Sequence, residues 1–291
     1  MRLYTAKNSE ETAVYVGYTG SGTVYPLSAY GMVYADMNDL IVNGQADLPA
    51  LRNAPKSGGV PLASLTLCAP IEYPRQDVLC LGINYLDHAK EADNFKGGTL
   101  SFARDAAIYF SKRVNKATAP GGIIPRHADI VDSLDYEVEL AVILGKDAKD
   151  VLAENAFDYV LGYSILNDVS ARNIQAAHKQ WYFGKSLDGF TPLGPCIVTA
   201  DEFAVPPQLR ICSTVNGEVR QSSNTSLLIT NIAEVLAEIT RGITLQAGTI
   251  IAMGTPAGVS MGFNPPKWLQ PGDTVTCEIE GIGQLTNTVG E

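Results

Sequence analysis

Acidic residues alternate with apolar residues over a short stretch in the middle of the chain. Asp135, Glu137 and Glu139 occupy every second position, and an apolar run follows at 140–144. Because successive side chains of a β-strand point to opposite faces, these three carboxylates would share one face. A half-buried strand that turns its charges to water has the same pattern. The alternation therefore indicates a strand but does not by itself indicate a site.

A further acidic residue, Asp168, follows a second apolar run at 159–166. A residue in this position commonly caps a helix. Two glutamates from one strand and an aspartate at the end of another can instead supply three oxygen ligands, which Mg²⁺ and Mn²⁺ prefer. Three carboxylates around a divalent ion leave a net charge of about −1, so a chelating keto acid would need nearby cations to bind there.

Two other groups of residues have spacing that suits chemistry. His88 and Glu91 lie three positions apart, so on a helix their side chains share a face and can form a hydrogen bond or a surface ion pair. Lys185 lies close to Trp181, Tyr182 and Phe183, whereas a solvated surface lysine usually has polar neighbours. Both groups are candidates for a site that also contains the carboxylates.

The composition limits the kinds of protein that could carry these residues. The chain has 291 residues, with 31 Asp and Glu against 21 Lys and Arg, and a formal net charge of −10. This acidity disfavours binding to nucleic acid or to anionic membranes. The first residues are polar and no apolar run approaches the ~20 residues of a membrane helix, so we expect a cytoplasmic protein. Five scattered cysteines without a C-x-x-C pair indicate reduced packing residues.

Short β-like runs bounded by glycine and proline dominate the chain and would position the candidate residues. The predicted strands are 78–81, 141–144, 159–165, 249–253 and 274–279. One helix is predicted at 231–241, capped by Asn231 with Glu234 and ended by a left-handed Gly242. A second helix is predicted to begin near Tyr85 and a loop to run from Glu91 to Arg104. The segment 53–61 is the predicted seam behind a small amino-terminal unit.

Five motifs, in this order, resemble those of the fumarylacetoacetate hydrolase family. They are Leu81 to Glu91, Asp135 to Leu140, Gly162 to Arg172, Gly184 to Asp188 and Gly254 to Val259. The resemblance covers residues 71–289, and it implies an α+β, mainly β fold: the family's mixed β-sandwich roll with a small amino-terminal domain at 1–70 and a catalytic domain at 71–291. It also implies that Glu137, Glu139 and Asp168 hold Mg²⁺ or Mn²⁺ and that the protein is a homodimer.

The resemblance also implies roles for individual residues. His88 and Glu91 match the family's dyad, in which the carboxylate orients imidazole as a base for water, and the loop 91–104 matches a lid. Lys185 would stabilise an enolate oxygen or a substrate carboxylate. Substrate contacts are expected from Thr255, Arg172, Gln175 and Lys112, although Arg113 replaces the proline that family members commonly have after this lysine. His127 and His178 match no motif and are expected to be surface or structural residues.

These roles point to an enzyme that acts on a small 2-keto acid and generates a pyruvate enolate bound to the ion. Our first hypothesis is a divalent-metal-dependent hydrolase that cleaves a C–C bond in 2,4-dioxo acids such as acylpyruvates and fumarylpyruvate. Oxaloacetate decarboxylation and isomerisation of a 2-hydroxyhepta-2,4-dienedioate type of substrate share that intermediate and remain alternatives. A non-catalytic homologue that binds a metal or metabolite is the contrasting hypothesis, and the retained dyad disfavours it.

Overall fold

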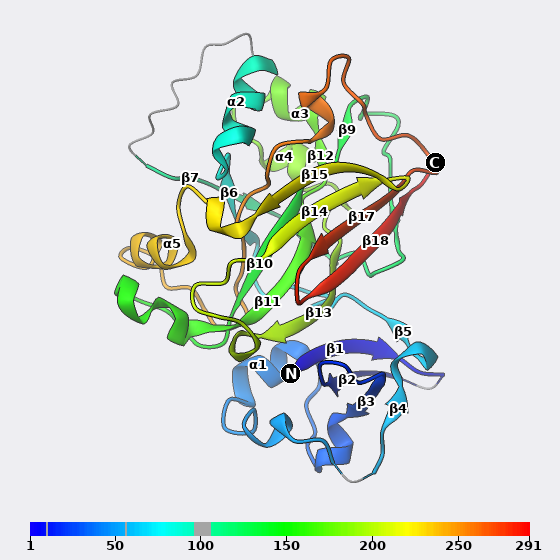
Figure 1. The fold of residues 1–291 in the computed structure, drawn as a ribbon, viewed down its shortest axis with the longest axis vertical. Coiled ribbons are helices and arrows are strands. Elements are labelled where there is room, and N and C mark those ends of the chain that lie inside the picture. The colour runs from blue at the N-terminus through cyan, green and yellow to red at the C-terminus, as the bar shows by residue number, and fades with distance from the viewer. Residues whose placement is uncertain (10, 56, 96–105) are drawn as a thin grey trace.

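The computed structural model describes residues 1–9, 11–55, 57–95 and 106–291. Strands dominate these residues, as Figure 1 shows, and helices are short and peripheral. The expected α+β class with mainly β structure is therefore confirmed. The predicted lid 91–104 is helical up to Phe95, and its remainder lies outside the described residues.

Within the described residues, the largest sheet has eleven strands. Its spatial order is β4 (Val60–Pro61), β3 (Thr23–Pro26), β2 (Thr12–Gly17), β1 (Arg2–Lys7), β13 (Leu193–Thr199), β11 (Val160–Asn167), β10 (Val138–Leu144), β16 (Ile250–Ala252), β6 (Val78–Gly82) and β7 (Ile108–Lys112), with β5 (Thr66–Leu67) also paired to β1. All neighbours are antiparallel except β16 and β6, which are parallel. The five strands predicted from apolar runs are all present.

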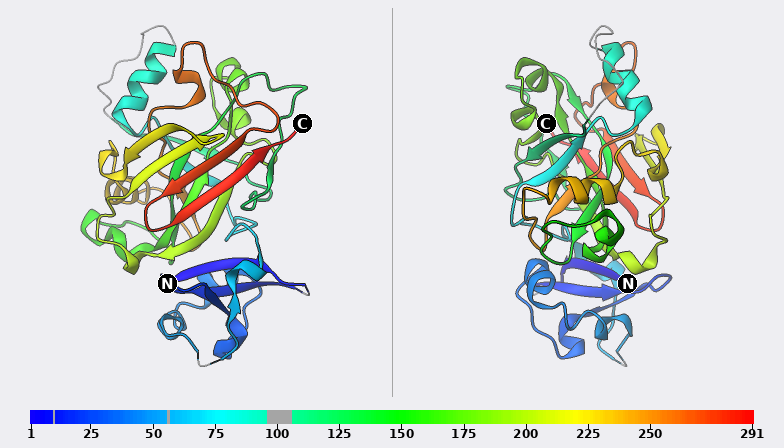
Figure 2. Two further views of the ribbon diagram at one scale, coloured as in Figure 1. Left: turned by 45° about the vertical axis from the view of Figure 1, so that its right-hand side comes forward. Right: turned by 90° about the vertical axis from the view of Figure 1, so that its left-hand side faces the viewer.

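A second sheet packs over the first, and a short ribbon lies beside the two. The second sheet has the order β15 (Glu218–Asn224), β14 (Arg210–Val215), β17 (Thr274–Ile279), β18 (Gly283–Val289) and β8 (Ile123–Ile124), and the ribbon pairs β12 (Ser170–Ala171) with β9 (Leu134–Asp135). Figure 2 shows the second sheet in front of the central strands. The two sheets enclose the larger of the two apolar cores.

Strand β10 illustrates how the sequence builds these layers. Leu140, Val142 and Leu144 contribute to the core between the sheets, whereas Ala141 and Ile143 contribute to the core on the opposite face. All seven residues of β10 are buried. An apolar run without alternation is expected for a strand covered on both faces. Glu137 and Glu139 therefore lie at the amino-terminal end of a strand that is buried on both faces.

The helices are α1 (Met37–Asn43), α2 (Leu86–Phe95), α3 (Arg172–Ala177), α4 (Tyr182–Lys185) and α5 (Ile232–Ile239). The predicted capping box at the start of α5 is present, since Asn231 and Glu234 bond each other's backbone N–H. The prediction that Gly242 ends this helix in a left-handed conformation is wrong, because Gly242 is not among the glycines with positive φ. The Thr240 hydroxyl instead donates to the Leu236 carbonyl at 2.6 Å and closes the last turn.

The amino-terminal strands continue the large sheet rather than forming a separate one. Strand β1 pairs with β13, and α1 packs into the same apolar core as Ala141 and Ile143. The predicted seam also contains strand β4, which pairs with β3. The lower part of Figure 1 shows this amino-terminal layer against the end of the central strands. The domain boundary at residue 70 remains a prediction.

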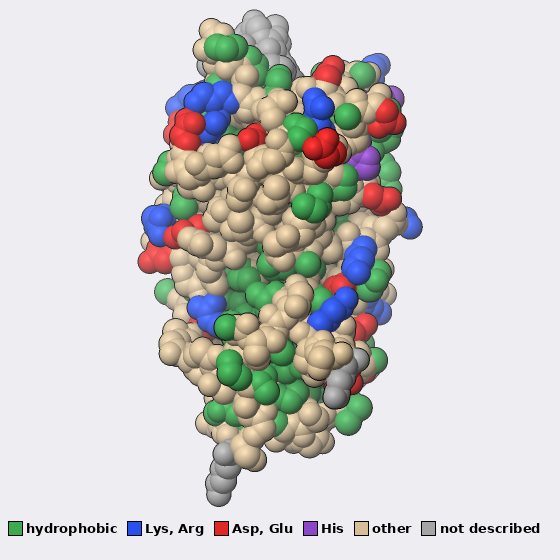
Figure 3. Space-filling view, turned by 90° about the vertical axis from the view of Figure 1, so that its right-hand side faces the viewer, with side chains coloured by type: hydrophobic (Ala, Val, Ile, Leu, Met, Phe, Trp, Pro, Cys, Tyr) green, Lys and Arg blue, Asp and Glu red, His purple; other side chains and the backbone are tan. Residues whose placement is uncertain are grey.

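Surface charge and helix length agree with the composition. On the face drawn in Figure 3, acidic and basic side chains are interspersed and form no large patch of one sign. In the part of the chain that the structure describes, no helix has the length and apolar character needed to cross a membrane. All five cysteines are free, and four of them are buried, as expected for packing residues.

Candidate active site

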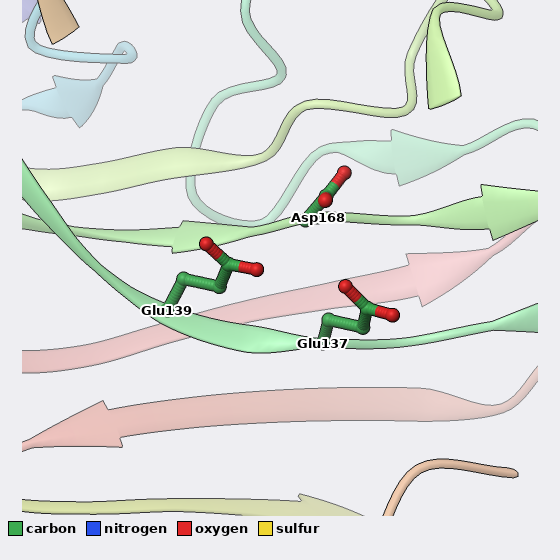
Figure 4. Close-up of side chains that lie close together, drawn as sticks. All are labelled: Glu137, Glu139 and Asp168. Carbon is green, nitrogen blue, oxygen red and sulfur yellow. The ribbon is translucent and has the colours of Figure 1, made fainter. Parts of the chain in front are cut away.

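Antiparallel pairing of β10 and β11 brings the three predicted metal ligands together. Glu139 lies in β10 opposite Leu166, and Glu137 immediately precedes that strand. Asp168 immediately follows β11, and its backbone N–H donates to the Glu137 carbonyl at 2.9 Å. Figure 4 shows the three carboxylates on the same side of these two neighbouring stretches of chain.

The three carboxylates are buried rather than turned to water. Glu137 is 5% exposed, Glu139 1% and Asp168 0%, and one oxygen of each lies within 4.8 Å of the others. Oxygens around an octahedral Mg²⁺ lie about 3 to 4 Å apart, so small side-chain movements would suffice to hold the ion. Three hard anionic donors in this arrangement fit Mg²⁺ or Mn²⁺.

Asp135 is not part of the acidic cluster, and the strand is interrupted between β9 and β10. Its carboxylate accepts from the Arg172 guanidinium at 2.8 Å and from the backbone N–H groups of Ser260 and Met261 at 2.6 and 3.3 Å. The single strand inferred from alternation over 135–139 is therefore wrong, since β10 begins only at Val138. This residue instead ties Arg172 to the segment 258–262.

Three buried cations neutralise the carboxylates. The Lys185 Nζ donates to Glu137 at 2.7 Å and to Asp168 at 2.6 Å. The Lys112 Nζ donates to the other Asp168 oxygen and to the Val169 carbonyl. The Arg172 guanidinium bonds Glu137 as well as Asp135. Burying a charge without a partner costs folding free energy. This pairing therefore explains how so many ionisable groups can lie together in the interior of the protein.

Burial and this charge pairing shift the pKa values of Glu139 and Glu137 in opposite directions. Burial raises the pKa of Glu139 well above its ordinary value, and the negative charges of Asp168 and Glu137 raise it further. For Glu137, burial acts in the same direction, but Lys185 and Arg172 outweigh it and hold the pKa below its ordinary value. In the absence of a metal, Glu139 is therefore the carboxylate of this pair that holds a proton more easily.

The predicted dyad is formed on helix α2. The His88 Nδ1 lies 3.0 Å from Glu91 Oε2, and His88 is 4% exposed. The second Glu91 oxygen accepts from the Gly258 backbone N–H at 3.0 Å. A Cβ atom at Gly262, in the 3₁₀ turn Ser260–Gly262, would collide with the Glu91 carboxylate and displace it. The segment 258–262 thus fixes the carboxylate that orients the imidazole.

His88 of the dyad and two residues of the acidic cluster, Glu137 and Glu139, line one cavity of about 400 Å³. Its floor contains Glu137, Glu139 and Lys185, and His88 lines it from α2. Apolar walls and further polar groups complete the lining: Leu81, Gly82, Ile83, Phe110, Trp181, Ala176, Met261, Thr255, Arg172, Gln175, His178 and Lys179. A cavity with apolar walls and a few convergent polar groups is typical of a small-molecule site.

The predicted substrate-binding residues differ in how free they are to bind. Gln175 lines the cavity, and its Oε1 accepts from Arg172 at 2.9 Å. Thr255 also lines it, but its hydroxyl donates to the Val138 carbonyl and accepts from Gln221. Lys112 is fully buried and is absent from the lining, so its geometry supports a role in holding Asp168. Direct substrate contact by these residues remains a prediction.

Arg113, which stands where family members commonly have proline, uses the backbone group that proline would lack. Its N–H donates to the Ser186 hydroxyl at 3.0 Å, next to Lys185. Strand β7 ends at Lys112 and remains paired with β6 throughout. The substitution therefore leaves the strand intact and adds a tie between β7 and the end of α4.

Sequence reasoning missed two cavity residues just beyond α3. His178 was expected to be a surface or structural residue, and Lys179 was not singled out, yet both line the cavity. Both lie in the connection between the end of α3 at Ala177 and the start of α4 at Tyr182. Residues in such a connection have no periodic pattern, so no local signal in the sequence marks them.

Comparisons with known proteins show which family the chain resembles in sequence and fold. A family model described as fumarylacetoacetate (FAA) hydrolase C-terminal matches residues 77–290. Oxaloacetate tautomerase YisK of Bacillus subtilis (strain 168) is 42% identical over 229 residues, which are 79% of this chain and 74% of the relative.

Two solved structures extend the likeness to the amino-terminal part. Fumarylacetoacetate hydrolase from psychrophilic Exiguobacterium antarcticum has 38% identity and a TM-score of 0.80, with 100% of this chain and 99% of that chain covered. Maleylpyruvate hydrolase from Sphingobium sp. SYK-6, in complex with manganese(II) ion and pyruvate, has 27% identity and a TM-score of 0.77 with the same coverage. The expected roll with its amino-terminal part is therefore confirmed.

Proposed function

The chain is an enzyme of the fumarylacetoacetate hydrolase family, and from that premise we propose that it is a divalent-metal-dependent hydrolase of 2,4-dioxo acids. It would cleave the C–C bond of an acylpyruvate and release pyruvate. The observation that carries this proposal is that His88, which is buried and paired with Glu91, lines the same cavity as Glu137 and Glu139 of the acidic cluster. A binding module has no need of a base beside its metal ligands.

Glu137, Glu139 and Asp168 would hold Mg²⁺ or Mn²⁺, a choice supported by their oxygen donors and by the manganese of the maleylpyruvate hydrolase structure. When bound, the ion would withdraw electron density from the keto acid and so stabilise negative charge that develops on the keto oxygen. The family role expected for these three side chains thus rests on their burial, proximity and charge.

His88 would supply the base for hydrolysis. Its Nδ1 faces Glu91, which leaves Nε2 to accept a proton from water. The hydroxide would attack the acyl carbonyl at C4, the C3–C4 bond would break, and its electron pair would leave with pyruvate as an enolate. The protonated imidazole would then return the proton to C3. The products are pyruvate and the carboxylic acid of the acyl group.

Lys185 and Gln175 would orient the substrate. The Lys185 ammonium lies between Glu137 and Asp168, where it can also donate to a substrate oxygen. Gln175 keeps its Nε2 group free of protein partners among the described residues while its Oε1 is held by Arg172. Both groups donate hydrogen bonds, as recognition of a carboxylate or an enolate oxygen requires.

Oxaloacetate chemistry is the second candidate, and the 42% identity to a protein named oxaloacetate tautomerase favours it. Tautomerisation or decarboxylation of oxaloacetate needs charge stabilisation at the keto oxygen and a proton carrier, but no attacking water. The same floor would serve both reactions. We also propose a homodimer, which light scattering of the purified protein would test.

Protein stripped of metal and then loaded with Mg²⁺ or Mn²⁺ would be assayed with acylpyruvates, oxaloacetate and a 2-hydroxyhepta-2,4-dienedioate. We expect pyruvate release from acylpyruvates, loss of turnover with chelator, and recovery on reloading. Turnover of oxaloacetate alone would assign the second candidate. Full hydrolysis by the metal-free protein would contradict the proposal.

A further inference from the structure

Val138 stands between the two glutamates of the acidic cluster, and its backbone groups lie beyond the end of a neighbouring strand. Strand β16 pairs with β10 at Ala141 to Ile143, and the Met253 N–H then donates to the Leu140 carbonyl. Residues two apart on a strand direct their backbone groups to the same side, so the N–H and C=O of Val138 face this side as well. Because β16 ends at Ala252 and buried backbone groups need hydrogen bonds, these two groups require other partners.

A ring of three hydrogen bonds supplies these partners. The Val138 N–H donates to Gln221 Oε1 at 3.1 Å, the Gln221 Nε2 donates to the Thr255 hydroxyl at 2.7 Å, and that hydroxyl donates to the Val138 carbonyl at 3.0 Å. Gln221 belongs to β15 of the second sheet, whereas Thr255 follows β16 and lines the cavity. The ring thus joins the backbone between the two glutamates to the cavity wall.

Gln221 uses its full hydrogen-bonding capacity in this network. Its Oε1 also accepts from the Ser213 hydroxyl at 2.9 Å, and its Nε2 also donates to the Pro256 carbonyl at 2.7 Å. A side-chain amide can accept two bonds through oxygen and donate two through nitrogen. Gln221 and Ser213 are both 0% exposed, so solvent does not compete for these bonds. The amide is therefore held in one orientation.

The network reaches Glu139 by a second route. Through Thr255 and Pro256, Gln221 also holds the segment 254–256 that follows β16. In this segment the Gly254 N–H donates to Glu139 Oε2 at 2.8 Å. Both the backbone next to Glu139 and a donor to its carboxylate therefore depend on one buried amide.

We propose that Gln221 is a positioning residue of the metal site, which acts on Glu137 and Glu139 through Val138 and the segment 254–256. This inference rests on the proposed function, since it requires the acidic cluster to hold the ion. Gln221 belongs to neither the acidic cluster nor the cavity lining. It holds the two carboxylates in place before the ion binds, so its loss lowers metal affinity even in protein that remains folded.

Calorimetric titration of the substrate-free protein with Mn²⁺ tests this. Gln221→Met keeps the length of the side chain but removes its amide, and it should weaken Mn²⁺ binding about tenfold, as loss of a partner that orients metal ligands usually does. Thr255→Val breaks two bonds of the ring and should have a similar effect, whereas Thr255→Ser keeps the hydroxyl and should retain the parent affinity. Because the first two changes break the same ring, combining them should cost less than the product of the single losses.

Asn287→Leu is the matched control, because Asn287 is also a buried side-chain amide of the second sheet and donates to the carbonyls of Ala119 and Gly122. It should lower the unfolding temperature of the metal-free protein, as Gln221→Met also should, but leave the Mn²⁺ affinity unchanged. An unchanged affinity in Gln221→Met, or an equal loss in Asn287→Leu, would overturn the inference alone.

If Gln221→Met fails to fold, the comparison of Thr255→Val with Thr255→Ser decides, and equal Mn²⁺ affinities of these two variants would overturn the inference. Failure of the parent protein to bind Mn²⁺ would instead contradict the metal site of the proposed function.

Discussion

The floor and the rim of the cavity are built in different ways. The floor lies at the ends of β10 and β11, where Glu137, Glu139 and Asp168 are almost fully buried and accept hydrogen bonds from buried cations or backbone. The rim, which consists of the exposed lining residues His178 and Lys179, lies in the connection between α3 and α4. Paired charges at strand ends fix a geometry, whereas Lys179 has no carboxylate partner among the described residues and is available to a ligand.

This difference suggests a division of labour. The floor would supply the reactivity common to keto-acid substrates. The dyad on α2 is separate from both regions, and Glu91 is held by the segment 258–262, to which Asp135 also bonds. Substitutions in the three regions should therefore differ in both the size and the kind of their effects.

The largest effect should follow from a change at the floor. Glu139→Gln should weaken Mn²⁺ binding by at least about 100-fold and abolish turnover, because a neutral amide offers the hard cation less charge. The variant should fold, since the raised pKa of Glu139 already favours a protonated, neutral side chain without metal. Calorimetry would measure the affinity, with the exposed Glu154→Gln as control. Unchanged Mn²⁺ affinity would contradict the assignment of the metal ligands.

A change at the dyad should be large but selective. His88→Ala should lower acylpyruvate hydrolysis by on the order of 10²–10⁴-fold, the usual contribution of a general base, with Mn²⁺ affinity intact. Oxaloacetate decarboxylation should fall less, because it needs no activated water. Glu91→Gln should have a milder effect in the same direction. Steady-state rates on both substrates would be compared with those of the control His127→Ala. The His127 ring does not line the cavity, and its Nε2 lies 2.9 Å from the exposed Asp188 carbonyl oxygen.

Equal losses of the two activities in His88→Ala would place the histidine in the step that both reactions share. The distinction between water activation at the dyad and charge stabilisation at the floor would then have to be abandoned.

A smaller effect should follow from a change that only displaces the dyad. A methyl group at residue 262 would push the Glu91 carboxylate away from His88, so Gly262→Ala should reduce hydrolysis about tenfold, as we also expect for Glu91→Gln. Combining Gly262→Ala with Glu91→Gln should add little further loss. Gly242→Ala, where an added methyl meets nothing, is the control. Additive losses would show that Gly262 acts elsewhere.

Much of the site could be predicted because its signals are local. The spacing of Glu137 and Glu139, the position of Asp168 after an apolar run, and the three-residue interval from His88 to Glu91 are each visible in a few consecutive residues. The same holds for the capping box of α5. Local periodicity reports backbone geometry, and backbone geometry sets which neighbouring side chains share a face.

The sequence by itself therefore determined the mainly β class, the acidic cluster and the His–Glu pair. Tertiary structure alone decided that Asp135 lies outside the acidic cluster and bonds Arg172 and residues 260–261, and that Lys112 bonds Asp168. It also decided that Lys179 lines the cavity. These outcomes depend on side chains far apart in the chain, whose partners are set by strand pairing and by the need to neutralise buried charge, and neither leaves a local pattern.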